Sequence, residues 1–241
     1  YYFISGSGNK NSFSRQNLKL ISKSLNNEQK KYKIFLCGGD TTLSRKLSFT
    51  ITSVGFSNKI IPRNKAKLND DIYVCGNLGD SFAGLYIQKK KIKINKNLKK
   101  YFIDKYYLPN LNLNLTNKLL SFANTSIDVS DGLIADLEKL INRQNLSYKI
   151  FLNDIPISTN LAKFIKLKRL KKKFFISRGD DYQILFTASP FKNRIINKIA
   201  KSSGVKISKI GKICSIFQKS HIIDEKGNKI VLKDKGYHHQ F

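Results

Sequence analysis

Short apolar stretches separated by polar segments recur along the chain. Residues 1–5 and 33–37 are short apolar runs, and residues 47–56 alternate between apolar and polar positions, which is typical of half-buried strands. Residues 14–30 show the weakly amphipathic spacing of a surface helix. Residues 58–71 are polar and lack any periodicity. We therefore place a domain boundary in that segment.

The rest of the chain mixes strand and helix patterns without a strict strand–helix–strand rhythm. The clearest helix pattern follows Asp131-Gly132, where an apolar stripe runs from Leu133 to Ile141. The Lys- and Asn-rich residues 90–113 predict a loop, and Asp80 is the expected N-cap of a helix. Expected strands are 72–75, 126–129, 148–152, 182–188, 206–214, 219–223 and 229–232, and expected helices are 80–89, 114–123, 132–143, 159–166 and 192–202.

This pattern predicts an α+β protein built of two-layer α/β sandwiches rather than a doubly wound parallel sheet. We expect two domains, 1–63 and 64–241. The 241 residues with 41% hydrophobic content are enough for one large core or two small ones.

Composition narrows the class of protein. No apolar run approaches the ~18 residues of a membrane span, and no secretory signal opens the chain. Cys37, Cys75 and Cys214 have no metal-binding or redox spacing, which is typical of reduced thiols in a cytoplasmic protein. The chain begins at Tyr1 and contains no methionine, so we expect a processed or truncated chain. Truncation is favoured because the first residues already predict a buried strand.

The net charge of +29 comes from 45 Lys and Arg against 16 Asp and Glu. One interpretation is an anionic partner, either nucleic acid or phosphates. The other is compositional bias toward Lys, Asn and Ile, and it is favoured because Lys outnumbers Arg and few aromatic residues interleave with the basic runs.

The scarce acids gather at turns next to glycine. In Asp128-Val129-Ser130-Asp131-Gly132, strand alternation sends Asp128 and Ser130 to one side, and Asp131 follows in the turn. Two carboxylates and a hydroxyl at a helix N-terminus can hold Mg²⁺ and the phosphates that it bridges. Alternatively, Asp131 only caps the helix and Asp128 satisfies a turn. Spacing alone leaves both interpretations open.

Two further segments carry acids beside glycine. Gly38-Gly39-Asp40-Thr41-Thr42 suits a metal–phosphate complex, since glycine lets backbone approach a ligand, but it also fits a tight turn. Arg178-Gly179-Asp180-Asp181-Tyr182 opens a strand, where paired acids either bind a cationic ligand or form a solvated edge. The sequence has neither a GxxxxGK[ST] phosphate loop nor a GxGxxG fingerprint.

Taken in order, the motifs resemble those of the thiamine-monophosphate kinase family. That family's pattern runs GGDTT, an arginine, GDxIYVTG, GTLGDSAAGL, D[IV]SDGLxADL, GGEDYELLFT and KGYDHF. This chain has GGDTT at 38–42, Arg63, DDIYVCG at 70–76, GNLGDSFAGL at 76–85, DVSDGLIADL at 128–137, RGDDYQILFT at 178–187 and KGYHH at 235–239.

The resemblance implies a fold of the aminoimidazole-ribonucleotide-synthetase-like type, with an incomplete N-terminal domain and a homodimer when full length. It implies direct in-line transfer of the ATP γ-phosphate to thiamine monophosphate, giving thiamine diphosphate, with Mg²⁺ and no phosphoenzyme. The residues carried over are Asp40, Asp128 and Asp131 for Mg²⁺, Gly39, Asp40, Arg63 and Ser130 for ATP, and Asp180 and Tyr237 for thiamine monophosphate.

The chain also departs from the family pattern. Asp180 stands where the pattern has Glu, and Arg178 stands where it has Gly. Segments that supply further metal ligands in the family would precede Tyr1, so the chain resembles the C-terminal two-thirds or more of such an enzyme, and we expect little activity from it alone. The alternatives are another ATP- and Mg²⁺-dependent enzyme of the same superfamily, a basic nucleic-acid-binding protein using Lys89–Lys91 and Lys171–Lys173, and an inactive relative.

Overall fold

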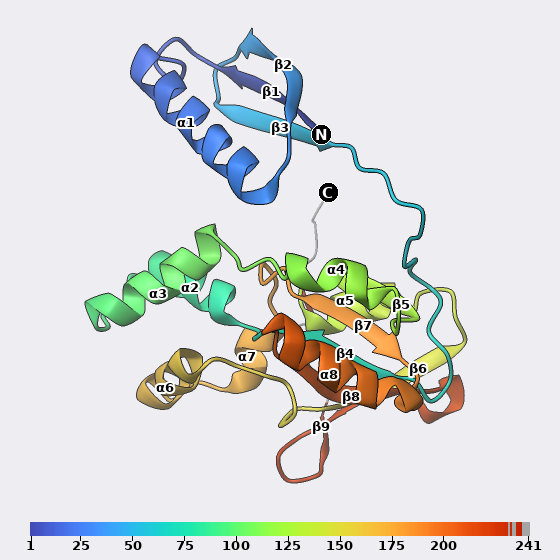
Figure 1. The fold of residues 1–241 in the computed structure, drawn as a ribbon. Helices are drawn as coiled ribbons and strands as arrows, with labels where there is room; N and C mark the ends of the chain where they lie inside the picture. The colour runs from blue at the N-terminus through green and yellow to red at the C-terminus, as the bar shows by residue number, and fades with distance from the viewer. Residues whose placement is uncertain (231, 233–234, 238–241) are drawn as a thin grey trace. The chain divides into compact units, whose positions relative to one another are not determined.

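The computed structural model describes residues 1–230, 232 and 235–237 (Figure 1). The chain forms two compact units, Tyr1–Asn58 and Lys59–Phe241, and each is described by itself. The roles expected for domains 1–63 and 64–241 stay predictions. His238 and His239 of the last motif lie outside the described residues.

The first unit is a three-stranded sheet with the strand order β2-β1-β3. Strand β1 (Tyr2–Gly8) pairs in parallel with β2 (Leu36–Leu43) and antiparallel with β3 (Ser48–Ser53). Helix α1 (Arg15–Tyr32) provides the crossover that two parallel strands require. Ser14 caps this helix, because its side chain accepts a hydrogen bond from the Asn17 amide at 3.3 Å.

The second unit is built on a seven-stranded sheet with the order β10-β9-β6-β8-β4-β7-β5. Neighbouring strands are antiparallel, except for the parallel pair β6 and β9. The expected α+β class is therefore confirmed. The strands are β4 (Asp71–Cys75), β5 (Thr125–Asp128), β6 (Leu146–Phe151), β7 (Ile184–Ala188), β8 (Ile207–Ser215), β9 (His221–Ile223) and β10 (Lys229–Ile230).

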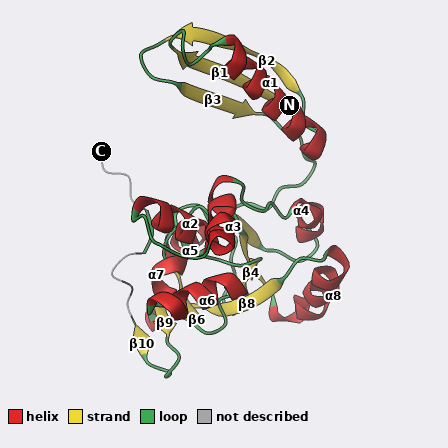
Figure 2. Ribbon diagram, turned by 90° about the vertical axis from the view of Figure 1, so that its left-hand side faces the viewer, coloured by secondary structure: helices red, strands yellow, loops and turns green. Residues whose placement is uncertain are grey.

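Helices cover both faces of the central strands (Figure 2). Helix α5 (Leu133–Leu140) packs on one face, and α4 (Leu113–Leu119) and α8 (Asn193–Ser203) pack on the other. Both sides of β4 are consequently buried, and its whole length is apolar after Asp71.

Alternation along β4 divides its side chains between two hydrophobic clusters. Ile72 and Val74 join the cluster that contains α5, whereas Tyr73 and Cys75 join the cluster that contains α4 and α8. The Tyr73 ring stacks on Phe186 of β7 with centroids 5.2 Å apart and planes 10° apart. This stacked cross-strand pair stabilises the pairing of β4 with β7.

A third cluster is aromatic and joins four helices beyond the sheet. These are α2 (Asp80–Lys89), α3 (Lys96–Tyr107), α6 (Thr159–Lys168) and the short α7 (Lys172–Ile176). The prediction of a loop over 90–113 was wrong for α3, and α7 was not predicted. In α3, the Asn95 side chain caps the N-terminus, and Leu98 and Phe102 form an apolar face that the surrounding Lys and Asn obscure.

Among the described residues, no helix combines the length and the apolar character needed to cross a bilayer. Cys37 is exposed, Cys75 and Cys214 are buried, and none of the three forms a disulfide. Burial raises the pKa of the Cys75 thiol to about 12.

Phe186→Ala should lower the free energy of unfolding by about 3–5 kcal/mol, because it removes a fully buried ring together with the stacking contact that this ring makes with Tyr73. Phe191→Ala is the matched control, since that ring is 95% exposed, and it should change stability by less than about 0.5 kcal/mol. Urea denaturation measures both values. Equal losses in the two variants would contradict the placement of Phe186 in the core.

Candidate active site at the start of helix α5

The turn between β5 and α5 is held by a carboxylate from within the helix. One oxygen of Asp136 accepts hydrogen bonds from the amides of Ser130, Asp131 and Gly132 at 2.9, 2.9 and 3.1 Å. Asp136 is fully buried, so these charge-assisted bonds stabilise an anion that water does not reach. The sequence shows this residue only as one more acid in the cluster, and its role was not predicted.

Asp131 does not cap α5. The N-cap residue is Gly132, which has no side-chain cap, and the Asp131 carboxylate instead forms an ion pair with Lys139. Lys139 also donates to Asp136 at 2.9 Å. Burial lowers the pKa of Lys139, but its hydrogen bonds to the two aspartates outweigh this effect and raise the pKa overall. The interpretation of Asp131 as only a helix cap is therefore wrong.

The segment that precedes β7 runs alongside this turn. The amide of Asp180 donates to the Ser130 carbonyl, and the amide of Tyr182 donates to the Val129 carbonyl, both at 2.9 Å. At Gly179, an added Cβ would lie 1.7 Å from the Ser130 carbonyl oxygen. Only glycine allows the two backbones to come this close.

A third segment, from near the C-terminus, crosses the first turn of α5. The Tyr237 amide donates to the Asp131 carbonyl at 2.8 Å, and the Ala135 amide donates to the Lys235 carbonyl at 3.0 Å. A Cβ at Gly236 would lie 2.5 Å from the Ala135 Cβ. This close contact brings the Tyr237 side chain to the pocket described below.

Backbone strain separates the two neighbouring acids Asp180 and Asp181. Asp180 and Tyr182 both adopt the left-handed region, with φ values of 67° and 51°. Such conformations cost roughly 1–3 kcal/mol each and cluster at functional sites. Asp180 consequently lines the pocket, whereas Asp181 is buried on the other side of the segment.

Asp181 serves the start of helix α2. Its carboxylate accepts from the amides of Gly79 at 2.7 Å and Ser81 at 3.3 Å. Burial raises its pKa well above the usual range, although both hydrogen bonds act to lower it. The expectation that Asp80 is the N-cap was wrong, because Gly79 holds that position and the capping carboxylate arrives from the distant Asp181.

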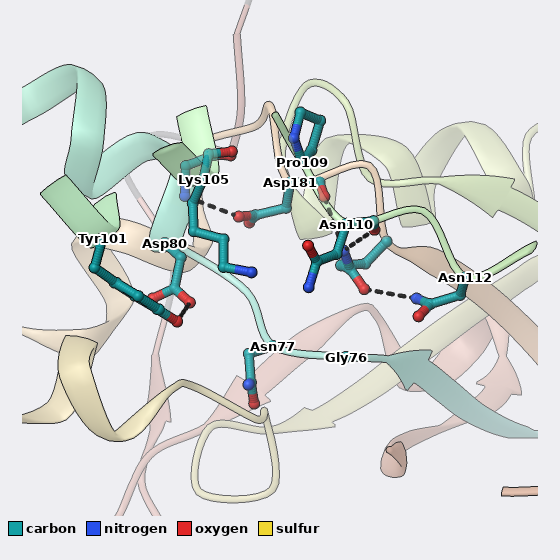
Figure 3. A pocket seen from close by; sticks show the side chains of 11 residues that line it. Gly76, Asn77, Asp80, Tyr101, Lys105, Pro109, Asn110, Asn112 and Asp181 are labelled. Carbon is teal, nitrogen blue, oxygen red and sulfur yellow. Dashed lines mark hydrogen bonds between the residues drawn. The ribbon is translucent and has the colours of Figure 1, made fainter. Parts of the chain in front are cut away.

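Asp80 faces a small polar cavity of about 110 Å³ behind the same helix start (Figure 3). Its carboxylate accepts from the Ser158 hydroxyl at 2.6 Å and the Tyr101 hydroxyl at 2.8 Å. Burial raises the pKa of Asp80, and these bonds and the charge of Lys105 oppose that rise. These hydrogen bonds connect α2 with α3 and with the N-terminus of α6.

A larger pocket of about 470 Å³ opens beside the turn. It contains charges of both signs, from Asp131 and Asp180 and from Lys89 and Arg178. Burial raises the pKa of Asp180, the charge of Asp131 adds to this, and Lys89 opposes it. The remaining lining residues are Phe82, Leu85, Ser130, Gly179, Tyr182 and Tyr237. The pocket suits a ligand that carries both a cation and an anion.

Of the predicted site residues, Ser130, Asp131, Asp180 and Tyr237 line this one pocket. Asp128 ends β5 just before the turn, with an exposed side chain. Arg63 does not line the pocket. It follows Pro62, whose carbonyl accepts from Thr125 at the opposite end of β5, and its role stays a prediction.

Gly39 and Asp40 belong to the first unit, within β2. The alternative of a tight turn at GGDTT was therefore wrong, because these residues continue the strand. A Cβ at Gly39 would lie 1.8 Å from the Ile4 carbonyl oxygen, so the glycine allows close pairing with β1. The Asp40 side chain is exposed and accepts from the Thr41 amide at 2.7 Å. The ligand roles of both residues stay predictions.

The turn carries oxygen donors of the kind that magnesium prefers. No group of three or more Asp, Glu, His or Cys side chains within the described residues could hold a metal by itself. Asp128, Asp131 and the Ser130 hydroxyl nevertheless supply hard oxygen donors at one turn. Magnesium in phosphoryl-transfer sites commonly uses one or two carboxylates and takes its other ligands from phosphates and water.

Asp136→Ala should destabilise the chain by about 3 kcal/mol or more, because three amides lose their charged acceptor in a buried turn. Asp136→Asn should recover part of this loss, since its carbonyl oxygen can still accept. Asp104→Ala removes an acid from an exposed ion pair with Lys100 and is the control, with an effect below about 0.5 kcal/mol. Urea denaturation and hydrogen exchange of the turn amides measure the effect, and unchanged exchange in Asp136→Ala would refute it.

No protein-family model matches the chain. Curated relatives do match it. A thiamine-monophosphate kinase of Buchnera aphidicola subsp. Acyrthosiphon pisum is 37% identical over 225 residues, which cover 92% of this chain and 69% of the relative. The thiamine-monophosphate kinase of Haemophilus influenzae is 35% identical over 230 residues, which cover 92% of this chain and 68% of the relative.

Solved structures share the fold. The thiamine monophosphate kinase of Aquifex aeolicus matches with a TM-score of 0.77 and 22% identity over 95% of this chain and 74% of that one, and a structure of AaThiL complexed with AMPPCP and TMP matches with a TM-score of 0.80 and 22% identity over 98% of this chain and 73% of that one. The hydrogenase maturation protein HypE of E. coli matches with a TM-score of 0.70 and 14% identity over 100% of this chain and 74% of that one. The identity and coverage of the curated relatives decide the family: the chain belongs to the thiamine-monophosphate kinases.

Proposed function

We propose that the pocket beside α5 is the acceptor site at which this kinase phosphorylates thiamine monophosphate with ATP, giving thiamine diphosphate. One observation carries the proposal. Ser130, Asp131, Asp180 and Tyr237, which come from three distant segments of the sequence, line a single pocket. The relatives named above carry the same activity in their names.

The charges of the pocket suit thiamine monophosphate, which carries a thiazolium cation and a phosphate. The Asp180 carboxylate is partly buried beside Asp131, so a bound cation would relieve the repulsion between the two acids. The exposed ring of Tyr237 offers an aromatic face to the thiazolium. Asp180 and Tyr237 are therefore the proposed acceptor-binding residues.

Asp128 and Asp131 would hold Mg²⁺ together with the ATP phosphates, and Ser130 would contact ATP. When bound, the metal supplies positive charge that offsets the charge developing on the phosphates. The attacking group is already a phosphate oxygen, so no side chain has to remove a proton from it. The protein would contribute position and charge, and the ion pair with Lys139 would hold the Asp131 carboxylate in place.

The remaining assignments belong to the same proposal. Asp40 would add a metal ligand, Gly39 and Arg63 would contact ATP, and the full-length enzyme would be a cytoplasmic homodimer. Asp40 and Gly39 lie on a strand edge of the first unit, where an exposed carboxylate follows close-packed backbone. Exposed carboxylates of this kind are available to a hard cation.

Asp128→Asn and Asp131→Asn should each lower turnover by at least roughly 100-fold, because each removes a charge that the metal–phosphate complex needs. Both variants should fold, since neither side chain is buried. The measurements are thiamine diphosphate formation in the full-length enzyme and calorimetric binding of Mg–ATP, with urea denaturation to confirm the fold.

Asp104→Asn is the matched control for these variants, because it makes the same chemical change on the exposed face of α3. It should leave turnover and Mg–ATP binding unchanged. Wild-type turnover in either Asp128→Asn or Asp131→Asn would show that the metal assignment is wrong.

A further inference from the structure

Two of the departures from the family pattern contact each other in the acceptor pocket. The pattern quoted above has alanine where this chain has Phe82, and glycine where it has Arg178. The two positions lie in different motifs, yet the Arg178 guanidinium lies over the Phe82 ring, 5.6 Å from its centroid. Both residues line the pocket that holds Asp180. The departures therefore form one structural unit.

The ring below the guanidinium is firmly held. Phe82 makes an edge-on contact with Phe174, with centroids 5.3 Å apart, and a tilted contact with Phe175, with centroids 6.1 Å apart. It belongs to the aromatic cluster that joins α2 and α7. A cation stacked on such an anchored ring loses little rotamer freedom when it binds a ligand.

Arg178 is also held at its other end. It is half-buried, its Nε atom is inaccessible to solvent, and its amide donates to the Phe175 carbonyl at 3.3 Å. Lys89, the other cation of the pocket, is exposed on the last turn of α2, and its positive charge acts to lower the pKa of Asp180. The two cations are thus unequal, and only Arg178 is fixed by packing.

We infer that Arg178, supported by Phe82, binds the phosphate of the acceptor. This inference rests on the proposed function and adds a residue to it. Asp180 faces the organic cation of thiamine monophosphate, and the planar guanidinium pairs with its phosphate oxygens in the bidentate way that arginine favours. The pocket then binds a zwitterionic ligand through two charges of opposite sign, those of Asp180 and Arg178.

The test compares two ligands that differ only by the phosphate. Ligand-observed NMR, which detects weak binding, measures the affinity of the whole chain for thiamine monophosphate and for thiamine. Arg178→Gln should weaken the binding of thiamine monophosphate by roughly 10- to 100-fold, which is the effect of losing a charge-assisted hydrogen bond. It should change thiamine binding by less than about twofold, because thiamine lacks the phosphate.

Three further variants sharpen the result. Arg194→Gln makes the same change on the exposed face of α8 and should bind both ligands like the wild type. Phe82→Ala should weaken the binding of thiamine monophosphate less than Arg178→Gln does, since the guanidinium remains and loses only its contact with the ring. Lys89→Gln should have a smaller effect than Arg178→Gln, because the amine is exposed.

The outcomes separate this inference from the proposed function. If the wild type binds neither ligand, the acceptor site itself is wrong and the inference falls with it. Suppose that the wild type binds thiamine monophosphate, but that Arg178→Gln lowers the affinity for both ligands equally or leaves both affinities unchanged. Only the inference is then overturned, and Arg178 merely shapes the pocket wall. If Lys89→Gln abolishes the binding of thiamine monophosphate and Arg178→Gln leaves it unchanged, Lys89 binds the phosphate instead.

Discussion

The buried carboxylate of Asp136 is the interaction on which the site depends. It lies inside the hydrophobic stripe of α5, and a bare anion there would be costly. Three amides and Lys139 satisfy it, and in doing so they fix the backbone from Ser130 to Gly132. The cost of burying the charge and the geometry of the turn are therefore two aspects of one interaction.

Once that turn is fixed, its carbonyl groups organise the neighbouring segments. The carbonyl groups of Ser130 and Val129 accept hydrogen bonds from amides of the segment before β7. The Asp131 carbonyl accepts a hydrogen bond from the Tyr237 amide. Glycine at 179 and 236 makes both approaches possible, because a Cβ at either position would overlap its neighbour. Residues far apart in sequence thereby reach the same pocket without any of them lying on a regular strand edge.

The sequence predicted the regular elements well where apolar spacing was clear. The strand before Asp128, the helix after Gly132 and the buried strand at 72–75 all form close to their expected bounds. It failed for α3, where Lys and Asn obscure the apolar face, and for α7, which is too short for a periodic signal.

The candidate site shows the same division. The motif acids were recognisable because they stand beside glycine in order along the chain. Their separate roles were not, because those roles depend on long-range contacts. Asp80 had the local appearance of a cap, yet the carboxylate that serves the start of α2 comes from Asp181. A positive φ at Asp180 decides that the adjacent acids face opposite ways, and local spacing does not reveal it.

Burial then divides the clustered acids into two groups with different tasks. Five of them are almost fully buried, namely Asp70, Asp71, Asp80, Asp136 and Asp181. A buried acid must be paired or hydrogen-bonded, so its position is explained by the fold alone. The acids that remain accessible are Asp40, Asp128, Asp131 and Asp180. Folding needs none of these four in that way, so they are the acids to which the proposed function assigns a ligand.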